Sequence, residues 1–341
     1  MASSLQTSLM IGTRLARNPV ILAPMSGITD APFRRMAIRL GAGMVVSEMT
    51  ACAALAQGRP NAKLRLEGQG QGLHVVQLAG CEPQWMTHGA RIAVDAGADV
   101  IDINMGCPAK HVTNGYAGSA LMRDLDHALS LIDATVQAVS VPVTLKMRLG
   151  WDHHTINAPA LARRAENAGV KLISVHGRTR CQFFAGRSDW AAVRAITESV
   201  TVPVVVNGDI ENFDDALAAL RASGAHAIMI GRGAQGRPWL LGQIARFLAT
   251  GIRAAPPSLG DQLTLIATLY DEMLIHHGVR IGLRHARKHL GWALDAAATT
   301  VGASRTVLKH WRDRVLTAEE PSETQRRLAD AFAALAWRAA A

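Results

Sequence analysis

The stretch Ala96-Gly-Ala-Asp-Val-Ile-Asp-Ile-Asn-Met-Gly-Cys-Pro108 contains, in order, a glycine turn, an apolar run and a polar loop. A glycine before the run is typical of a helix end followed by a short connection. Apolar residues in succession indicate a strand that is buried on both faces, as in a parallel sheet covered by helices. One βα unit of an α/β protein is therefore predicted here.

The same order of elements recurs eight times at intervals of roughly 23 to 43 residues, the length of a strand plus a crossover helix. Eight successive units over roughly 240 residues predict a (β/α)8 TIM barrel, with an open doubly wound sheet as the alternative. The apolar runs are Val20–Leu22, Met44–Ser47, His74–Leu78, Val100–Ile103, Val143–Met147, Leu172–Val175, Val204–Val206 and Ala227–Ile230.

The pattern changes after residue 250. Gly251, Pro256, Pro257 and Gly260 indicate a linker, and no strand-like run follows it. Four helical segments are expected instead, at 263–276, 282–294, 304–315 and 322–339. The sequence thus predicts a barrel domain over residues 1–250 and a small all-α domain over residues 251–341.

Composition bounds the function. Of the 341 residues, 49% are hydrophobic and 18% charged, which excludes a disordered or fibrous chain. The net charge of +9 favours a polyanionic partner, and the window 280–314 alone carries +6. A solvated helix face is the alternative reading of that window. Aromatic residues are only 4%, so we expect nucleic acid to be held mainly by its phosphates.

The four cysteines form no C-x-x-C pair, so neither a disulfide framework nor a zinc ribbon is indicated. His285 and His289 are spaced for a shared metal, but no third ligand is evident, and no metal site is expected. Neither a signal segment nor a long apolar stretch is found. We expect a cytoplasmic protein without membrane association, a monomer with no stable protein partner.

Function in such barrels collects where the strands end, and polar residues gather after these runs. Gly231-Arg-Gly-Ala-Gln-Gly236 satisfies G-x-G-x-x-G, but it follows the eighth run and no acidic residue follows at the expected distance. A phosphate site formed with Asn207-Gly208-Asp209 is therefore favoured over a dinucleotide fold.

Lys146 lies on the same side of its strand as Thr144 and Arg148. A cation that faces into a barrel requires an anion, whereas the alternative is a surface lysine. Cys107 follows the fourth run between Gly106 and Pro108. That place favours a nucleophile or proton donor over a small apolar filler.

Six motifs lie at the ends of predicted strands, in chain order. They are Ala23-Pro-Met-Ser-Gly-Ile-Thr-Asp30, Asn104-Met-Gly-Cys-Pro108, Leu145-Lys-Met-Arg148, Val175-His-Gly-Arg-Thr-Arg180, Asn207-Gly-Asp209 and Gly231-Arg-Gly233. Together these motifs resemble the tRNA-dihydrouridine synthases, and the resemblance covers the barrel from about residue 12 to 250. Pro108-Ala-Lys-His-Val-Thr-Asn114 and Ala117-Gly-Ser-Ala-Leu-Met-Arg-Asp124 are similar to the bacterial B subgroup.

The resemblance implies an oxidoreductase with an FMN-binding catalytic barrel and a tRNA-binding helical domain. Using NADPH, it would reduce a D-loop uridine of tRNA to 5,6-dihydrouridine, with position 17 favoured. Hydride would pass from flavin N5 to C6 of uracil, and Cys107 would protonate C5. NADPH rather than NADH, the position reduced and the orientation of the tRNA cannot be read from the residues.

Residue by residue, Lys146 would face the N1/O2 edge of the flavin. Pro24, Met25, Ser26 and Gln77 would line its ring, and His176, Asn207, Gly208, Asp209, Gly231 and Arg232 would hold the ribityl chain and phosphate. A uracil must be flipped out of the folded tRNA, which requires a broad basic surface that grips the tRNA backbone. The candidates for that grip are Arg148, Arg178, Arg180, Arg284, Arg287 and Lys288.

Two rival functions follow from the same residues. Another FMN barrel would reduce a free pyrimidine or enone without any dependence on tRNA. An RNA-binding protein with an inactive barrel is the other, against which the presence of Cys107 and Lys146 argues.

Overall fold

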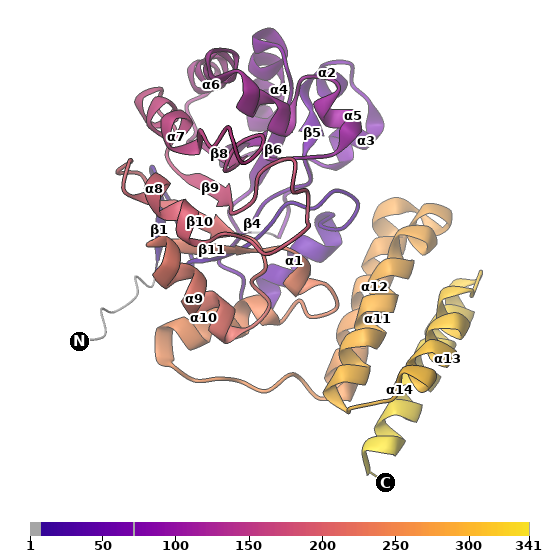
Figure 1. The fold of residues 1–341 in the computed structure, drawn as a ribbon. Coiled ribbons are helices and arrows are strands. Elements are labelled where there is room, and N and C mark those ends of the chain that lie inside the picture. The colour runs from indigo at the N-terminus through magenta and orange to yellow at the C-terminus, as the bar shows by residue number, and fades with distance from the viewer. Residues whose placement is uncertain (1–7, 71, 341) are drawn as a thin grey trace. The chain divides into compact units, whose positions relative to one another are not determined.

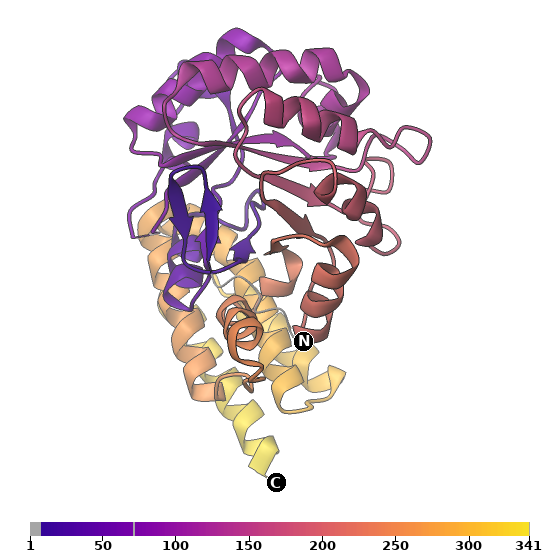
Figure 2. The ribbon, with the colours of Figure 1, turned by 90° about the vertical axis from the view of Figure 1, so that its left-hand side faces the viewer.

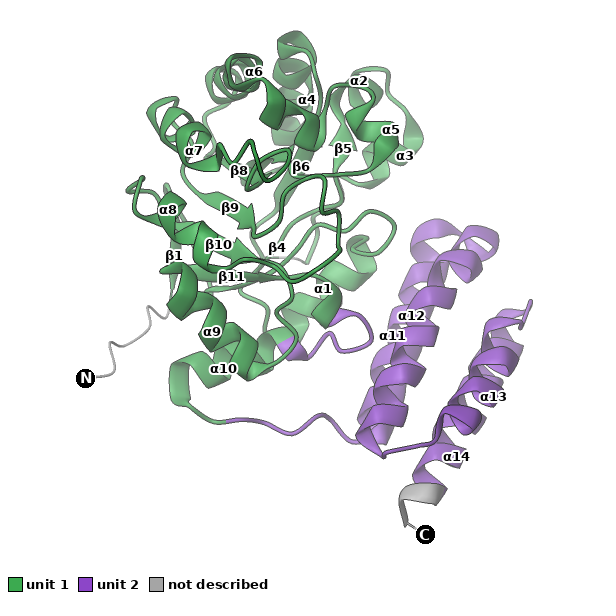
Figure 3. Ribbon diagram, in the orientation of Figure 1, with its two compact units in different colours: residues 1–233, 241–252 green, residues 234–240, 253–341 purple. Residues whose placement is uncertain are grey.

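A computed structural model describes residues 8–70 and 72–340, so the first seven residues of the expected barrel domain lie outside the described residues. Two compact units make up the chain, and Figure 3 colours them separately. One contains residues up to 233 together with 241–252. The other contains residues 234–240 and the chain from 253 onward.

The first unit is the predicted (β/α)8 barrel, and Figure 1 shows its sheet enclosed by helices. All neighbouring strands of its sheet are parallel. The strands are β3 (Val20–Leu22), β4 (Met44–Val45), β5 (Thr50–Ala51), β6 (Val75–Ala79), β7 (Val100–Met105), β8 (Val143–Arg148), β9 (Ile173–His176), β10 (Val204–Asn207) and β11 (Ala227–Ile230).

The second barrel position is divided between two short strands. β4 pairs with β3, β5 pairs with β6, and a parallel bridge from Val46 to Val75 joins the two edges. The nine strands therefore occupy the eight positions of a closed barrel. The predicted runs agree with the observed strands to within a few residues, because β-branched residues buried on both faces define them.

Helices connect successive strands. They are α1 (Ala31–Arg39), α2 (Cys52–Ala56), α3 (Pro60–Leu64), α4 (Pro83–Asp95), α5 (Lys110–Thr113), α6 (Leu125–Ala138), α7 (Ala158–Asn167), α8 (Arg194–Thr197), α9 (Phe213–Ser223) and α10 (Leu240–Thr250), with short 3-10 turns η1 (Gly118–Arg123), η2 (Ala191–Val193) and η3 (Arg232–Ala234).

A hairpin that the sequence did not predict precedes the barrel. It consists of β1 (Leu9–Ile11) and β2 (Arg14–Ala16), and Figure 2 shows it in indigo. Leu9, Ile11 and Ala16 join the hydrophobic cluster that the barrel strands form. The turn at Gly12 lies near Pro142 and Lys171, which precede β8 and β9. The hairpin therefore covers the end of the barrel where the strands begin, and leaves the opposite end to the polar loops.

The second unit is the predicted all-α domain. Its helices are α11 (Leu259–His277), α12 (Val279–Thr300), α13 (Arg305–Leu316) and α14 (Pro321–Ala340), each near a predicted segment. Ser258 and Ser304 cap α11 and α13 by accepting backbone N–H groups. Leu269, Leu294 and Phe332 are among its buried apolar residues. No helix in the described part of the chain is long and apolar enough to cross a membrane.

Candidate active site

A chain of buried polar side chains crosses the neighbouring strands β6, β7 and β8. Asp102 accepts hydrogen bonds from the Gln77 amide (2.7 Å) and the Thr144 hydroxyl (2.6 Å). The Asn104 amide donates to Gln77 (2.8 Å). Burial raises the pKa of Asp102, while its two donors oppose that shift. The network fixes the orientation of both amide side chains at the barrel mouth.

Cys107 is held through its backbone on both sides. Its N–H donates to the side-chain amide oxygen of Asn104 (3.0 Å), and its own C=O accepts from the Ser119 hydroxyl (2.8 Å) and N–H (3.0 Å). The residue is half-buried. A thiol is thus presented at the mouth from a fixed backbone, as a proton donor to a bound substrate must be.

Lys146 points into the same region. It is only 8% exposed, and its ammonium donates to the side-chain oxygen of Asn207 (3.2 Å). Asn207 is itself held by donating to the Met229 carbonyl (2.8 Å). Burial lowers the pKa of Lys146 to about 8, although the Asp102 carboxylate raises it. Because an ammonium has three donors, this one can also bind an anionic ligand atom.

Arg148 is buried and links the loop of Cys107 to the loop after β9. Its guanidinium donates to the carbonyls of Gly106 (2.8 Å), Thr179 (2.8 Å) and Phe183 (2.9 Å). Burial lowers its pKa to about 10. At 1% exposure it does not reach the surface, which differs from the expectation that it meets tRNA phosphates.

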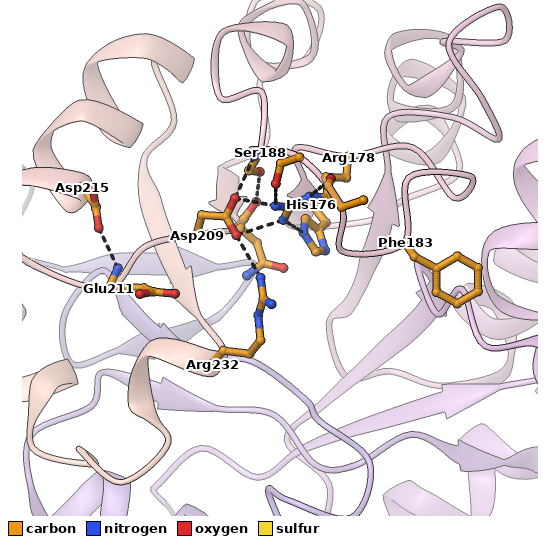
Figure 4. A network of polar contacts seen from close by, with 12 residues as sticks. His176, Arg178, Phe183, Ser188, Asp209, Glu211, Asp215 and Arg232 are labelled. Carbon is orange, nitrogen blue, oxygen red and sulfur yellow. Dashed lines mark hydrogen bonds and ion pairs between the residues drawn. The ribbon is translucent and has the colours of Figure 1, made fainter. Parts of the chain in front are cut away.

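Arg178 was also expected to contact tRNA phosphates, and it too is buried. It is 1% exposed and forms a two-pronged ion pair with Asp209 (2.6 and 3.0 Å), as Figure 4 shows. Asp209 also accepts from Arg232 (3.0 Å) and from the Ser188 N–H (2.8 Å). The pair therefore joins the loops after β9, β10 and β11.

His176 lies against this network, and its Nε2 is 3.3 Å from Arg178. Since a guanidinium can only donate, Nε2 accepts and the ring proton lies on Nδ1. Burial first, and then Arg148 and Lys146, hold the pKa of His176 well below its ordinary range. A neutral imidazole is therefore present near neutral pH.

The loop after β10 needs its glycine. Gly208 has φ +120°, and a Cβ there would collide with the Ser188 and His176 side chains. The Trp190 indole donates to the Gly208 carbonyl (2.7 Å). Gly231 and Arg232 follow the neighbouring strand β11, and Arg232 is 49% exposed. This corner combines compact backbone with an accessible cation, as a phosphate site requires.

The loop after β3 is held from two sides. The Met25 N–H donates to the Thr29 hydroxyl (2.8 Å), and the Gly27 N–H donates to the Glu48 carboxylate. Pro24 and Met25 are half-buried, and Ser26 is exposed. Glu48 was not predicted as a site residue. A carboxylate in the otherwise uncharged stretch after β4 was the signal that could have identified it.

Asp102 and Phe184 were also missed. Asp102 alternates with Ile101 and Ile103 on β7, and that alternation was the signal for an inward carboxylate. Phe184 is 53% exposed, and its ring contacts the guanidinium groups of Arg148 and Arg232. Nothing in the sequence around Phe184 distinguishes it from a loop residue.

The predicted barrel residues therefore gather where the strands end, whereas Arg284, Arg287 and Lys288 belong to α12 of the second unit. Near the mouth, the cations outnumber the carboxylates: Lys146, Arg148, Arg178, Arg180 and Arg232 against Glu48, Asp102 and Asp209. Such an excess favours an anionic ligand. The fold and the site together define a (β/α)8-barrel enzyme with a cationic active site.

The sequence pattern of the family described as Dihydrouridine synthase (Dus) matches residues 21–335. The chain belongs to this family and is an enzyme of that type. It is 52% identical over 312 residues to a probable tRNA-dihydrouridine synthase of Rhizobium leguminosarum bv. phaseoli, covering 92% of this chain and 94% of the relative.

The B subgroup is represented among the relatives. The tRNA-dihydrouridine synthase B of Xanthomonas axonopodis pv. citri (strain 306) is 47% identical over 285 residues, which are 83% of this chain and 86% of the relative. Among solved structures, histamine dehydrogenase from Rhizobium sp. 4-9 has a TM-score of 0.54 at 15% identity, over 79% of this chain and 51% of its own. That likeness shows the barrel fold alone.

Proposed function

We propose that this enzyme reduces a D-loop uridine of tRNA to 5,6-dihydrouridine, with FMN as cofactor, NADPH as reductant and position 17 as the favoured site. The relatives are named tRNA-dihydrouridine synthases, which supports the formation of dihydrouridine in tRNA. The observation that carries the proposal is a buried lysine at the same barrel mouth as a half-buried cysteine.

The residues present fit FMN. Lys146 is buried with a single hydrogen bond among the described residues, so the anionic edge of a reduced isoalloxazine would add a counter-charge to that of Asp102. Pro24, Met25, Ser26 and Gln77 would line the ring. His176, Asn207, Gly208, Asp209, Gly231 and Arg232 would hold the ribityl chain and the phosphate.

Bound FMN, once reduced by NADPH, would supply the hydride that C6 of uracil requires. Cys107 donates the matching proton to C5, and the thiolate then regains a proton from solvent. Lys146 holds positive charge beside the cofactor, and the Asp102–Gln77–Asn104 network keeps Gln77 and the Cys107 backbone in place.

The tRNA would be held by cations that are accessible. Arg180 is partly exposed, and Arg284, Arg287 and Lys288 lie on α12 with no ion pair recorded in the described part of the chain. These side chains would contact phosphates, so that one flipped uridine enters the barrel mouth. We further propose a cytoplasmic monomer without a stable protein partner.

The test is to identify the flavin released from the purified protein, and then to supply NADPH and tRNA that lacks dihydrouridine. We expect FMN, and dihydrouridine at one D-loop position, located by mass spectrometry of tRNA fragments. Turnover of free uracil or an enone without tRNA would favour a small-molecule reductase. A protein that binds tRNA but no FMN would be a non-catalytic RNA-binding protein.

A further inference from the structure

Tyr116 lies on the loop that begins at Cys107. That loop runs through the short helix α5 and returns at Ser119, whose hydroxyl and N–H both bind the Cys107 carbonyl. The N–H of Tyr116 donates to Thr113 (3.1 Å) and the N–H of Ala117 donates to Val112 (3.3 Å). The loop is thus closed on itself, and Tyr116 has a fixed backbone position on the same loop as the thiol.

The side chain of Tyr116 is not used by the fold. It is 72% exposed, and among the described residues it makes no hydrogen bond or ring contact. The backbone has φ +55°, the left-handed region that a bulky residue adopts at a cost of about 1–3 kcal/mol. Tyr116 is one of only two tyrosines in the chain. The ring is therefore exposed and makes no contact within the described residues, so it is available to a ligand.

The charge around Tyr116 selects the class of ligand. No Asp or Glu occurs from Cys107 to Arg123, and Lys110 is exposed on α5. Thr113, at the end of α5, contacts Arg180 (3.4 Å). The Arg180 guanidinium also lies against the rings of Trp151 and Phe183, and its buried Nε has no partner in the described part of the chain. The surroundings are cationic, and they complement phosphates.

We propose that Tyr116 stacks on an unpaired nucleobase of the tRNA next to the uridine that enters the barrel. This rests on the proposed function and names a contact that fixes which nucleotide is presented to Cys107. An aromatic face binds any base, while the neighbouring cations bind the backbone on either side. The phenol hydroxyl has no part in the contact.

Three variants separate stacking from other roles. Tyr116→Asn removes the ring and keeps a residue that tolerates positive φ, so the loop is not strained further. Tyr116→Phe keeps the ring and removes the hydroxyl. Leu15→Asn makes the same polar replacement at an exposed residue of the β1–β2 hairpin, at the other end of the barrel.

The measurement is tRNA affinity of the FMN-loaded enzyme at several salt concentrations, together with dihydrouridine formation. For Tyr116→Asn we expect binding to weaken roughly 5- to 150-fold, the loss of one stacked base, with an unchanged salt slope and unchanged FMN content. Tyr116→Phe and Leu15→Asn should match wild type within about twofold.

The proposal is overturned if Tyr116→Asn binds tRNA as tightly as wild type, or if Tyr116→Phe loses as much affinity as Tyr116→Asn. A lower turnover number with unchanged tRNA affinity also overturns it, because Tyr116 would then act as a cover over the site. In all these cases the wild type still forms dihydrouridine. If the wild type forms none, the proposed function fails first, and the stacking proposal fails with it.

Discussion

Lys146 lies in an environment that differs strongly from that of a free side chain. It is buried, its ammonium has one hydrogen-bond partner among the described residues, and Asp102 lies close enough to raise its pKa against the effect of burial. Under the proposed function, this burial cost would be offset when the cofactor binds beside the ammonium. Removing the charge should therefore stabilise the empty fold at neutral pH and weaken the site.

The pH dependence of stability tests this cost. The folded protein gives up the Lys146 proton near pH 8, whereas the unfolded chain keeps it to about 10.5. Between those values the unfolded state binds more protons, so the contribution of Lys146 to the free energy of unfolding rises with pH. Below pH 8 the full cost of the buried charge is present.

We therefore expect the free energy of unfolding of flavin-free wild type, minus that of Lys146→Met, to rise by up to about 3 kcal/mol from pH 8 to 10.5. Urea titrations of both proteins at several pH values measure it. The subtraction removes the titration of all other groups. A difference that does not change with pH would show that Lys146 has an ordinary pKa.

The loops after β9, β10 and β11 depend on one carboxylate. Asp209 meets Arg178, Arg232 and the Ser188 N–H, and Figure 4 shows these partners converging on it. Arg178 is 1% exposed, so its guanidinium has no access to water if the carboxylate is lost. Without that carboxylate, the three loops should lose their common contact, and the proposed phosphate site that they form should be disrupted.

For Asp209→Asn we expect the free energy of unfolding to fall by about 2–4 kcal/mol, because a buried cation loses its charge partner. Asp215→Asn is the matched control. Asp215 accepts one backbone N–H, from Glu211, at a partly exposed position, and its loss should cost less than about 1 kcal/mol. Urea unfolding of both variants compares them, and equal losses would contradict the central role of Asp209.

Strands were the most predictable elements. Runs such as Val204–Val206 are apolar on both faces, which only a covered parallel sheet provides. The hairpin β1–β2 was missed, because three-residue strands carry too little alternation to be read. Residues 234–240 group with the helical unit, where Gly236 packs against Trp292, and no local pattern indicates that contact.

At the site, the burial of a side chain was harder to predict from the sequence than the place of its residue along the strands. The polar residues were predicted to lie together because parallel strands of a barrel all end at the same mouth. Arg148 and Arg178 were assigned to tRNA from charge alone. Each is long enough to turn inward to backbone carbonyls or Asp209, and a sequence does not show which way such a side chain turns.

At the scale of the whole molecule, the two units have different roles in the proposed function. The barrel contains the buried site, while Arg284 and Arg287 are exposed on α12 and Lys288 is partly exposed. Phosphate contacts release counterions, so each cation that touches tRNA adds to the salt dependence of binding. The number of α12 cations in contact is therefore measurable without a structure of the complex.

Replacing Arg284, Arg287 and Lys288 together by glutamine should lower the slope of log affinity for tRNA against log salt by about 2 to 3. The control replaces Arg91, Arg163 and Arg221, which are exposed on the outer helices α4, α7 and α9. Both variants lose three positive charges. Equal slopes in filter-binding titrations of the two variants would contradict a phosphate contact at α12.

The most direct test of the account is dihydrouridine formation by Cys107→Ala in its FMN-loaded form, with NADPH and unmodified tRNA. We expect wild-type FMN content and wild-type tRNA affinity, since the Cys107 backbone is held by Asn104 and Ser119 and not by the thiol. Dihydrouridine formation should fall by a factor of at least about 100, the loss of one positioned general acid. Unchanged formation of dihydrouridine by this variant would contradict the account.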